Sequence, residues 1–354
     1  MSNLIEMGNR TIGHGNKPLF LPDIGTFFNQ DIDMASGVIK TLIESDVEVV
    51  KGEILHTPDV CLKAECSEKY FGWKSKKVIE ENYRELIERK VVSLDKYEQL
   101  FQKCKDSGID FLVSVYDKEG ADFAKEIGAI SLKIASSNIT HYPLIKYIST
   151  MGLPLIIDTG LSSLEEISRA INWAMDAKCK NIIIEHSPAG PPAPVANHNL
   201  MFMHTLSNMF GVPYGLSDHH AGEEMLYAAT VLGASVLEKG VCRDDVGDEQ
   251  DTGHALPLSK VKDVLQKIDN IYSAVGDGIR YLPRNREKKR ARMGLVANQD
   301  LAPGDIITDK NITFSWPAKG IEVEFYEQVI GWEIRKALAK GDVISWADIC
   351  NVDT

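Results

Sequence analysis

A short stretch of the chain, residues 215–222, carries the densest set of groups that could do chemistry. It reads Gly-Leu-Ser-Asp-His-His-Ala-Gly, so a hydroxyl, a carboxylate and two imidazoles stand together. An apolar run at 210–214 precedes it and a helical pattern at 223–232 follows it, and such strand-to-helix junctions are where α/β folds place their active sites. The residue types fit a metal site, a phosphate site or a polar turn. Adjacent histidines point to different sides of an extended chain, so we expect only one of His219 and His220 to face a site.

Polar or ionisable side chains also end the other apolar runs of the chain. In chain order the complete set is Asp23, Lys51, Ser114, Lys133 with Ser136, Asp158, Glu185 with His186, Ser217 to His219, and Glu238 with Lys239. If the runs are strands of a barrel, these side chains meet at its mouth. Two buried lysines with nearby hydroxyls fit the binding of a phosphate or carboxylate. Two alternatives remain open: Lys133 forms a Schiff base with a carbonyl substrate, or a lysine pairs with a barrel carboxylate such as Glu53 or Glu238.

The order of the segments between residues 18 and 274 predicts a (β/α)8 TIM barrel spanning residues 1–279. Helical patterns such as 97–105 and 163–176 separate most of the apolar runs, which is typical of this fold. The eight runs are 18–22, 47–50, 111–115, 130–135, 154–157, 181–184, 212–216 and 236–237. A doubly wound open sheet is the alternative, but no G-x-G-x-x-G follows the first run.

The character of the sequence changes after the predicted barrel. Residues 280–292 are basic and contain a proline, and we interpret them as a solvated linker; the alternative is a nucleic-acid patch. Residues 293–354 show short β runs separated by turns. Such a small module is near the lower limit for an independent core, so we expect it to pack against its own barrel or a partner subunit.

Composition excludes several classes of protein. The formal net charge of −12 argues against nonspecific binding of nucleic acid. No apolar run is long enough to span a bilayer, and the first twenty residues lack a signal-peptide pattern. The six cysteines form no C-x-x-C pair and no zinc-ligand spacing, which indicates reduced thiols in the cytoplasm. A metal bound by His219 would need further ligands, and the candidates are Asp218, Glu185, His186, Glu238 and His254.

Several motifs carry a resemblance to a known family. In the barrel they are Cys104-Lys-Asp-Ser-Gly-Ile-Asp-Phe111, Leu132-Lys-Ile-Ala-Ser136, Asp158-Thr-Gly-Leu-Ser-Ser-Leu-Glu-Glu-Ile167, Gly215-Leu-Ser-Asp-His219 and Leu232-Gly-Ala-Ser-Val-Leu-Glu-Lys239. Over almost its whole length the chain resembles the sialic acid synthases, together with the related legionaminate, pseudaminate and spore-coat polysaccharide enzymes. The C-terminal module, with Asp300-Leu-Ala-Pro-Gly-Asp-Ile306, resembles the antifreeze-like SAF domain of these enzymes.

The resemblance implies a cytoplasmic transferase of carbohydrate biosynthesis. Such an enzyme condenses phosphoenolpyruvate with an N-acyl amino sugar, releases phosphate and gives an α-keto acid, with Mn²⁺ or Mg²⁺ as its metal. It also implies a homodimer in which each SAF domain caps the partner's barrel. Carried over by position, the implied roles fall on Lys51 and Lys133 (phosphoenolpyruvate), Ser114, Ser136, Ser217 and Asn29 (substrate contacts), Asp23 (catalytic carboxylate), Glu238 (sugar) and His219 (metal).

The chain departs from the family pattern at several of these positions. Gly240 stands where the second metal-binding histidine is expected, and Asp158, kept in the substrate-binding set, stands where a serine is expected. Trp316 replaces an arginine of the SAF domain. The residues therefore leave three hypotheses: a synthase with a changed acceptor sugar, a catalytically altered or non-catalytic member that binds a sugar or phosphate ligand, and a Schiff-base lyase or aldolase that uses Lys133.

Overall fold

The computed structural model describes residues 4–72, 74–188, 193–281 and 291–352. The chain divides into two compact units, Met1–Asp277 and Gly278–Thr354. Most of the predicted linker, at 282–290, and part of the proline-rich loop, at 189–192, lie outside the described residues.

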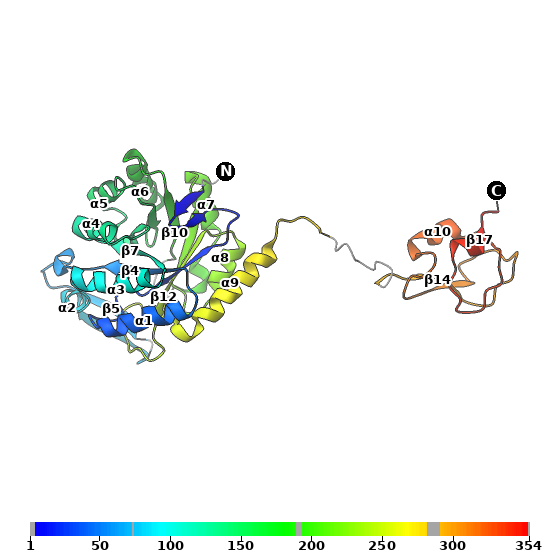
Figure 1. The fold of residues 1–354 in the computed structure, drawn as a ribbon, viewed down its shortest axis with the longest axis horizontal. Helices are drawn as coiled ribbons and strands as arrows, with labels where there is room; N and C mark the ends of the chain where they lie inside the picture. The colour runs from blue at the N-terminus through cyan, green and yellow to red at the C-terminus, as the bar shows by residue number, and fades with distance from the viewer. Residues whose placement is uncertain (1–3, 73, 189–192, 282–290, 353–354) are drawn as a thin grey trace. The chain divides into compact units, whose positions relative to one another are not determined.

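The first unit is a closed barrel of eight parallel strands, so the predicted TIM barrel is confirmed (Figure 1). The last strand pairs with the first, Val236 opposite Leu19 through Gly240 opposite Asp23, and this pairing closes the sheet. In order around the barrel the strands are β3 (Leu19–Asp23), β4 (Val49–Ile54), β7 (Asp110–Val115), β8 (Leu132–Ile134), β9 (Leu155–Asp158), β10 (Ile182–His186), β11 (Tyr214–Asp218) and β12 (Val236–Cys242).

A helix follows each strand, and together the helices surround the barrel (Figure 1). They are α1 (Ile32–Glu44), α3 (Leu94–Asp106), α4 (Lys118–Glu126), α5 (Tyr142–Ile148), α6 (Leu164–Asp176), α7 (Phe202–Phe210), α8 (Glu224–Val231) and α9 (Val261–Val275). The start of α6 shows how local sequence sets these limits. Ser163 and Glu166 form a capping box, and the buried face, from Ile167 to Ala174, follows at helical spacing.

An N-terminal hairpin, β1 (Ile5–Met7) paired with β2 (Arg10–Ile12), packs against one end of the barrel interior. Its apolar side chains form one buried cluster with inward-facing strand residues: Leu19, Leu21, Val49, Leu112, Ile156, Ile183 and Val236. These residues come from the beginnings or middles of their strands. The apolar core therefore occupies the amino-terminal end of the barrel, and the carboxyl ends of the strands are left for polar side chains.

A second hairpin, β5 (Ser67–Gly72) and β6 (Lys77–Asn82), follows β4 along the chain and precedes a short helix, α2 (Tyr83–Glu88). The side chain of Asp248, on the connection after β12, accepts hydrogen bonds from two backbone amides of the hairpin turn, those of Lys74 and Ser75. Arg89 then pairs with Glu249 at 2.9 Å. The two connections that follow β4 and β12 are thus held together.

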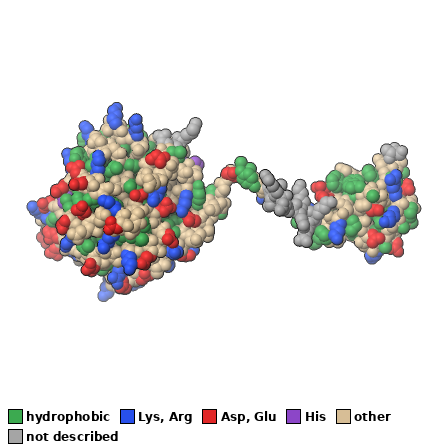
Figure 2. All heavy atoms as spheres, viewed as in Figure 1, with side chains coloured by type: hydrophobic (Ala, Val, Ile, Leu, Met, Phe, Trp, Pro, Cys, Tyr) green, Lys and Arg blue, Asp and Glu red, His purple; other side chains and the backbone are tan. Residues whose placement is uncertain are grey.

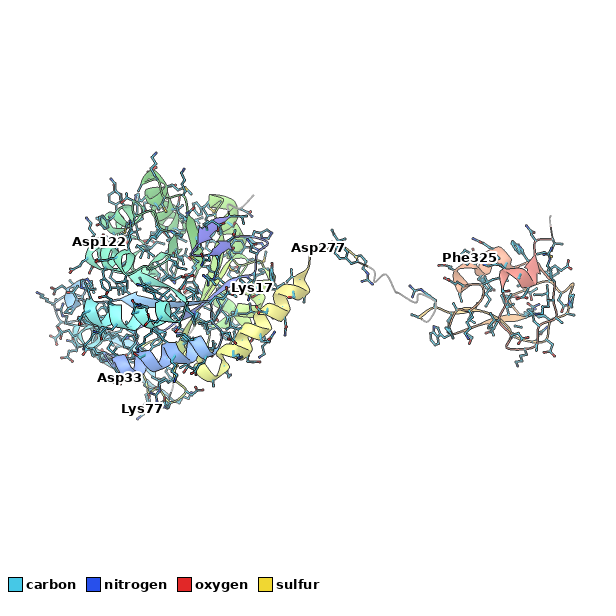
Figure 3. The ribbon with its side chains drawn as sticks, viewed as in Figure 1. Lys17, Asp33, Lys77, Asp122, Asp277 and Phe325 are labelled. Carbon is cyan, nitrogen blue, oxygen red and sulfur yellow. The ribbon has the colours of Figure 1, made fainter. Side chains whose placement is uncertain are left out.

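Surface charges on the barrel unit are mixed in sign. Figure 2 shows acidic and basic side chains interspersed over the displayed face of this unit. Lys17, labelled in Figure 3, is one example, because it pairs with Asp269 of α9 at 2.6 Å and with Glu48 at 3.5 Å. Among the described residues no helix is long and apolar enough to cross a membrane.

The second unit is a small β-rich domain, as the sequence predicts. Its elements are β14 (Gly294–Ala297), β15 (Ile312–Ser315), α10 (Tyr326–Val329), β16 (Glu333–Ile334) and β17 (Ile349–Cys350). Strand β14 pairs with β15, and β16 with β17, both antiparallel. Leu295, Ile307, Ile321 and Ile344 are fully buried at the centre of a separate apolar core.

Candidate active site at the barrel mouth

Six of the eight strands continue further than the apolar runs that predicted them. Glu185 and His186 are the last residues of β10, and Glu238 and Lys239 lie within β12. Neighbouring strands place polar residues at equal heights, with Asp158 opposite Glu185. Since side chains at equal heights on neighbouring strands point to the same side of the sheet, the inward-facing polar residues form a layer above the apolar core.

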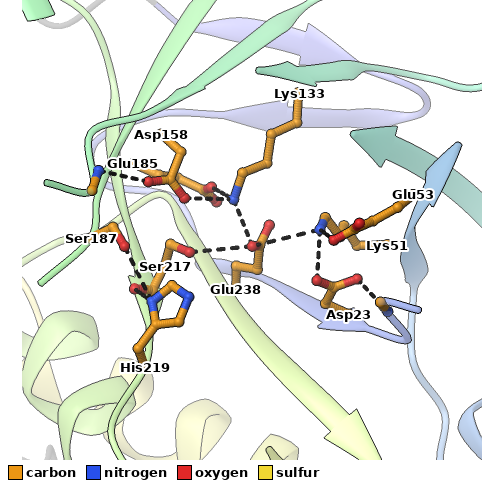
Figure 4. A network of polar contacts seen from close by, with 12 residues as sticks. Asp23, Lys51, Glu53, Lys133, Asp158, Glu185, Ser187, Ser217, His219 and Glu238 are labelled. Atoms are coloured by element: carbon orange, nitrogen blue, oxygen red, sulfur yellow. Dashed lines mark hydrogen bonds and ion pairs between the residues drawn. The ribbon is translucent and has the colours of Figure 1, made fainter. Parts of the chain in front are cut away.

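Lys133 lies at the centre of three carboxylates. Its Nζ atom is 2.6 Å from Glu185, 2.6 Å from Glu238 and 3.0 Å from Asp158 (Figure 4). All four side chains are buried, and Glu185 is 0% exposed. The expected alternative, in which a lysine pairs with a barrel carboxylate, is therefore present here. Burial alone would lower the pKa of Lys133, but the three negative charges outweigh it and raise the pKa well above its usual value.

Lys51 is the second buried ammonium of the mouth. Its Nζ donates to Asp23 at 2.6 Å and lies 3.5 Å from Glu53 and 3.9 Å from Glu238. The hydroxyl of Tyr116 donates to the other oxygen of Glu53 at 2.7 Å. Glu238 thus joins the two lysines into one network of ion pairs, which Figure 4 shows.

Hydroxyl groups and His219 border this network. The Ser217 hydroxyl donates to Glu238 at 3.2 Å, and His219 Nδ1 lies 3.1 Å from the Ser187 hydroxyl. Gly160 brings Ser136 close as well: a β-carbon at position 160 would lie 3.0 Å from the Ser136 hydroxyl oxygen and 3.2 Å from that of Ser187. The loops after β8, β9 and β10 therefore meet beside His219.

The remaining predicted residues lie in different settings. The Ser114 hydroxyl is buried and has no hydrogen-bond partner among the described residues. Asn29, in the loop after β3, contacts the connection after β12, where its side-chain amide donates to Glu249 at 2.6 Å. Gly240 faces the Phe27 ring, which a β-carbon at position 240 would touch at 3.5 Å. An aromatic side chain thus lies against position 240, where the family resemblance implies a second metal-binding histidine.

The carboxylates of the mouth fall into two groups by pKa. Burial, opposed by Lys51 and reinforced by Glu238 and Glu53, raises the pKa of Asp23 to about 7. Burial likewise raises the pKa of Glu185 to about 8, against the attraction of Lys133. The pKa values of Asp158 and Glu238 are lowered, because the adjacent lysine charge outweighs their burial. At neutral pH the mouth therefore holds ionised carboxylates beside acids that keep a proton.

Glu185 makes the stability of the fold depend on pH. A folded-state pKa of about 8 against an ordinary value of 4.5 means that the folded chain keeps a proton that the unfolded chain releases. We expect this residue to lower the free energy of unfolding as pH rises from about 4.5 to about 8. In Glu185→Gln the decline should be shallower, measured as urea midpoints across that interval. Equal pH slopes in the two proteins would contradict the prediction.

The family resemblance implies a divalent metal. Asp158, Glu185 and Glu238 each offer an oxygen atom, and these atoms lie within 4.8 Å of one another. It is the one group of three or more possible ligands found among the described residues. Carboxylate oxygens are ligands that suit Mg²⁺ and Mn²⁺. In this structure the three carboxylates surround the Nζ atom of Lys133, which lies 2.6 Å, 2.6 Å and 3.0 Å from them. His219 contacts the ring of His254, 4.6 Å between centroids, but is not part of that group.

Sequence reasoning missed or underrated three residues of the network. Glu53 was expected only as a lysine partner and Glu185 only as a strand end or metal ligand. Tyr116 was not identified at all, because an aromatic residue after an apolar run is usually core. The signal was present in the spacing, since Glu53 is two residues after Lys51 and Tyr116 two after Ser114, and residues two apart on a strand face the same side.

The chain matches two known sequence families. The pattern of the NeuB family matches residues 38–280, and that of the SAF domain matches residues 292–349. An N,N'-diacetyllegionaminic acid synthase of Campylobacter jejuni is 30% identical over 319 residues, which are 89% of this chain and 95% of that protein. An uncharacterized protein of Methanocaldococcus jannaschii is 28% identical over 98% of both chains.

A solved structure agrees with these matches at the level of the fold. The N-acetylneuraminic acid synthetase of Leptospira borgpetersenii has a TM-score of 0.70 at 22% identity, covering 81% of this chain and 95% of that one. The NeuB pattern covers most of the chain, from within α1 to beyond α9. The chain is therefore a member of the NeuB family with a C-terminal SAF domain.

Proposed function

We propose that this chain condenses phosphoenolpyruvate with the aldehyde group of an N-acyl amino sugar to give a sialic-acid-like α-keto acid. A carbon–carbon bond forms between the methylene carbon of phosphoenolpyruvate and the aldehyde carbon. One water is consumed and inorganic phosphate is released. The observation that carries the proposal is the pair of buried ammonium groups, Lys51 and Lys133, joined by Glu238 at the mouth of a NeuB-family barrel. The named synthases among its relatives support the substrate class.

The two lysines provide the positive charge that an anionic substrate needs. In the proposal they bind the phosphate and carboxylate of phosphoenolpyruvate, with hydroxyl contacts from Ser114, Ser136 and Ser217. The unpartnered Ser114 hydroxyl supports this arrangement, because a buried hydroxyl without a partner is costly unless a ligand accepts its hydrogen bond. Asp158 pairs with Lys133 and so reduces the positive charge that this lysine presents to a ligand.

Asp23 is the proposed acid–base group. Its pKa of about 7 allows it to take up and release a proton near neutral pH. Its Oδ2 atom contacts Lys51 at 2.6 Å, so the carboxylate already lies beside the proposed substrate-binding cation. Glu238 and Asn29 complete the proposed set, Glu238 towards the sugar and Asn29 from the loop that follows β3.

A divalent metal, Mn²⁺ or Mg²⁺, is part of the proposal. Two sets of groups are available to hold it: His219, which the resemblance implies, and the carboxylates of Asp158, Glu185 and Glu238. When bound, the ion polarises the sugar aldehyde. Its charge would favour an anionic substrate at a mouth where carboxyl groups outnumber the two ammonium groups.

The ion pairs of Lys133 favour a second candidate function, that of a catalytically altered member of the family. Its ammonium already pairs with three internal carboxylates, so less of its charge is left for a phosphate group. A catalytically altered member would keep the fold and bind a sugar ligand without turning over phosphoenolpyruvate. The same ion pairs keep Lys133 protonated, and a Schiff base requires a free amine, so we do not propose the lyase.

The assay is phosphate release by the full-length protein. The protein is mixed with phosphoenolpyruvate, Mn²⁺ and a panel of N-acyl hexosamines, each in its free and its phosphorylated form. We expect one phosphate to be released for each α-keto acid formed, and only when an acceptor sugar is present. Lys51→Met, measured in parallel, should abolish it. Failure of every acceptor to release phosphate, in protein that still binds a sugar by calorimetry, would contradict the synthase and favour the second candidate.

The assembly and location follow the same proposal. We propose a homodimer in which the SAF domain of each subunit caps the partner's barrel, and a cytoplasmic location. The support is the presence of both family patterns in one chain. Light scattering of the full-length protein should give twice the mass of one chain, and half of that value would contradict the dimer.

A further inference from the structure

Two carboxylates share the ammonium group of Lys51. Its Nζ atom donates to Asp23 Oδ2 at 2.6 Å and lies 3.5 Å from Glu53 Oε1 (Figure 4). Lys51 and Glu53 are two residues apart on β4, so their side chains lie on the same side of the sheet. The side chain of Glu53 is 21% exposed and that of Asp23 is 12% exposed, so Glu53 is the more open of the two. A change at Glu53 therefore reaches Asp23 through an ammonium group that lies beside both.

Tyr116 holds Glu53 from the neighbouring strand. Strand β4 pairs in parallel with β7 up to Ile54 opposite Val115, and Tyr116 is the next residue along the chain. The Tyr116 hydroxyl donates to Glu53 Oε2 at 2.7 Å, whereas the other oxygen of Glu53 faces Lys51. A hydrogen bond to a carboxylate at this distance is charge-assisted and strong. Tyr116 thus fixes the place of the Glu53 charge.

We propose that Glu53 and Tyr116 are positioning residues for Asp23: Glu53 shares the Lys51 ammonium group with Asp23, and Tyr116 holds Glu53 where this sharing occurs. Neither residue is assigned a contact with the substrates. The catalytic meaning of the inference rests on the proposed function, in which Asp23 is the acid–base group. The effect of Glu53 on the proton of Asp23 requires no substrate.

The charges around Asp23 show the direction in which Glu53 acts. Burial is the largest cause of the raised pKa of Asp23, and the charge of Lys51 opposes it. The negative charges of Glu238 and Glu53 raise this pKa further. Glu53 acts in two ways, because it repels a second negative charge and because it draws on the positive charge of Lys51. Both favour the protonated acid, so the pKa of Asp23 should fall when the Glu53 charge is removed.

Glu238 also lies near Lys51, but its strongest contact is elsewhere. Its Oε1 atom accepts a hydrogen bond from Lys133 at 2.6 Å and lies 3.9 Å from Lys51. Glu53 is closer to Lys51, at 3.5 Å, and its hydrogen bond comes from an uncharged hydroxyl group. Among these two carboxylates, Glu53 is therefore the one that competes with Asp23 for Lys51.

Two further titratable groups respond to the charge of Glu53. Burial above all raises the pKa of Tyr97, on α3, and of Asp251, on the connection after β12. The charge of Glu53 adds to the rise in both. Neither residue has an acid–base role in the proposed reaction, so Asp23 is the group through which Glu53 would affect catalysis.

The test is titration of Asp23 in the full-length protein without substrates. Protein labelled with ¹³C-aspartate gives a carboxyl signal for Asp23, assigned by its absence in Asp23→Asn. We expect a midpoint of about 7 in the wild type. In Glu53→Gln the midpoint should be lower by at least about half a pH unit. Tyr116→Phe should move the midpoint in the wild type but not in Glu53→Gln, because Tyr116 acts through the Glu53 charge.

A second tyrosine–carboxylate pair provides the matched control. The Tyr147 hydroxyl, on α5, donates to Asp122, on α4, also at 2.7 Å, and Figure 3 labels Asp122 at the surface of the barrel unit. Asp122→Asn and Tyr147→Phe should leave the midpoint of Asp23 within about 0.2 of a pH unit of the wild type, because this pair shares no partner with Asp23.

Turnover gives a readout that structural damage would not produce. In Glu53→Gln the rise of kcat/KM with pH should move to lower pH by the same amount as the midpoint, whereas a damaged fold would lower activity without moving it. An Asp23 midpoint in Glu53→Gln equal to or above that of the wild type would overturn the proposal. So would a full effect of Tyr116→Phe in the Glu53→Gln background.

Tyr116→Phe keeps the proposal testable if Glu53→Gln fails to fold. An unmoved Asp23 midpoint in Tyr116→Phe alone would then overturn it. Because the titration contains no substrate, the expected shifts in a protein that releases no phosphate would refute the proposed function and leave the positioning of Asp23 standing. Phosphate release with unmoved midpoints would do the reverse.

Discussion

Lys133→Met is expected to lower the free energy of unfolding by about 3–5 kcal/mol near neutral pH, the largest stability effect of any single substitution at the mouth. The substitution shortens the side chain by one atom and removes the ammonium group. Asp158, Glu185 and Glu238 then remain buried without their nearest cation. Such a loss exceeds what removing an exposed ion pair costs, which is typically below about 1 kcal/mol.

The pH dependence of this loss identifies its cause. Without Lys133 the pKa values of the three carboxylates rise, so the folded variant takes up protons as pH falls and regains part of its stability. The difference from wild type should therefore be smaller near pH 5 than near pH 8, measured by urea unfolding. Adding Glu185→Gln to Lys133→Met should recover part of the loss at the higher pH.

A matched control uses a lysine at the surface. Lys262 pairs with Asp46 at 3.0 Å, and both side chains are more than two-thirds exposed. Lys262→Met should change the free energy of unfolding by less than about 0.5 kcal/mol. If Lys133→Met were equally mild, the three carboxylates would not depend on this lysine, and the account of the mouth as one network of charges would be wrong.

Asp23→Asn is expected to reduce kcat by roughly 10²- to 10⁴-fold, the size of effect that loss of a general acid–base group produces. The amide still accepts the hydrogen bond from the Gly25 amide, so the loop keeps its anchor. The KM for phosphoenolpyruvate should change much less, because Lys51 and Lys133 remain. Such a split between kcat and KM separates a chemical role from a binding role.

The pH profile gives a second readout for Asp23. As a base the residue works in its deprotonated form, so kcat/KM should rise with pH through about 7 and then level off. This limb should be missing in Asp23→Asn. Asp23→Glu restores a carboxylate that is one methylene longer, as the family resemblance implies for this position, and should retain a measurable share of the activity. A kcat of Asp23→Asn within about threefold of wild type would contradict the role.

The barrel was predictable because its strands are apolar and its helices amphipathic. The carboxyl ends of the strands were not predictable, because the apolar pattern ends at the last apolar residue even where the strand continues. Backbone pairing does not depend on side-chain polarity, so β10 includes Glu185 and His186 and β12 continues to Cys242. The small hairpins β1–β2 and β5–β6 were also missed, because three to six residues are too few for a period to stand out.

The candidate site shows the same division between local and tertiary information. Lys51 was found from its position after an apolar run, and Lys133 from its position within one. That Lys133 holds three acids depends on strands far apart in the sequence, with Glu238 105 residues away. Asn29 likewise meets Glu249 across 220 residues, a contact between loops that no local pattern encodes. Sequence reasoning thus located the mouth, while its balance of charges required the structure.

In the proposed function, the lysine–carboxylate mouth binds phosphoenolpyruvate together with a divalent metal. A crystal structure of the full-length protein with Mn²⁺ and phosphoenolpyruvate tests it most directly. We expect anomalous density for Mn²⁺ at the barrel mouth, with phosphoenolpyruvate in contact with the Nζ atoms of Lys51 and Lys133. Crystals at saturating ligand in which both lysines still contact only their carboxylates, and phosphoenolpyruvate lies elsewhere or is absent, would contradict it.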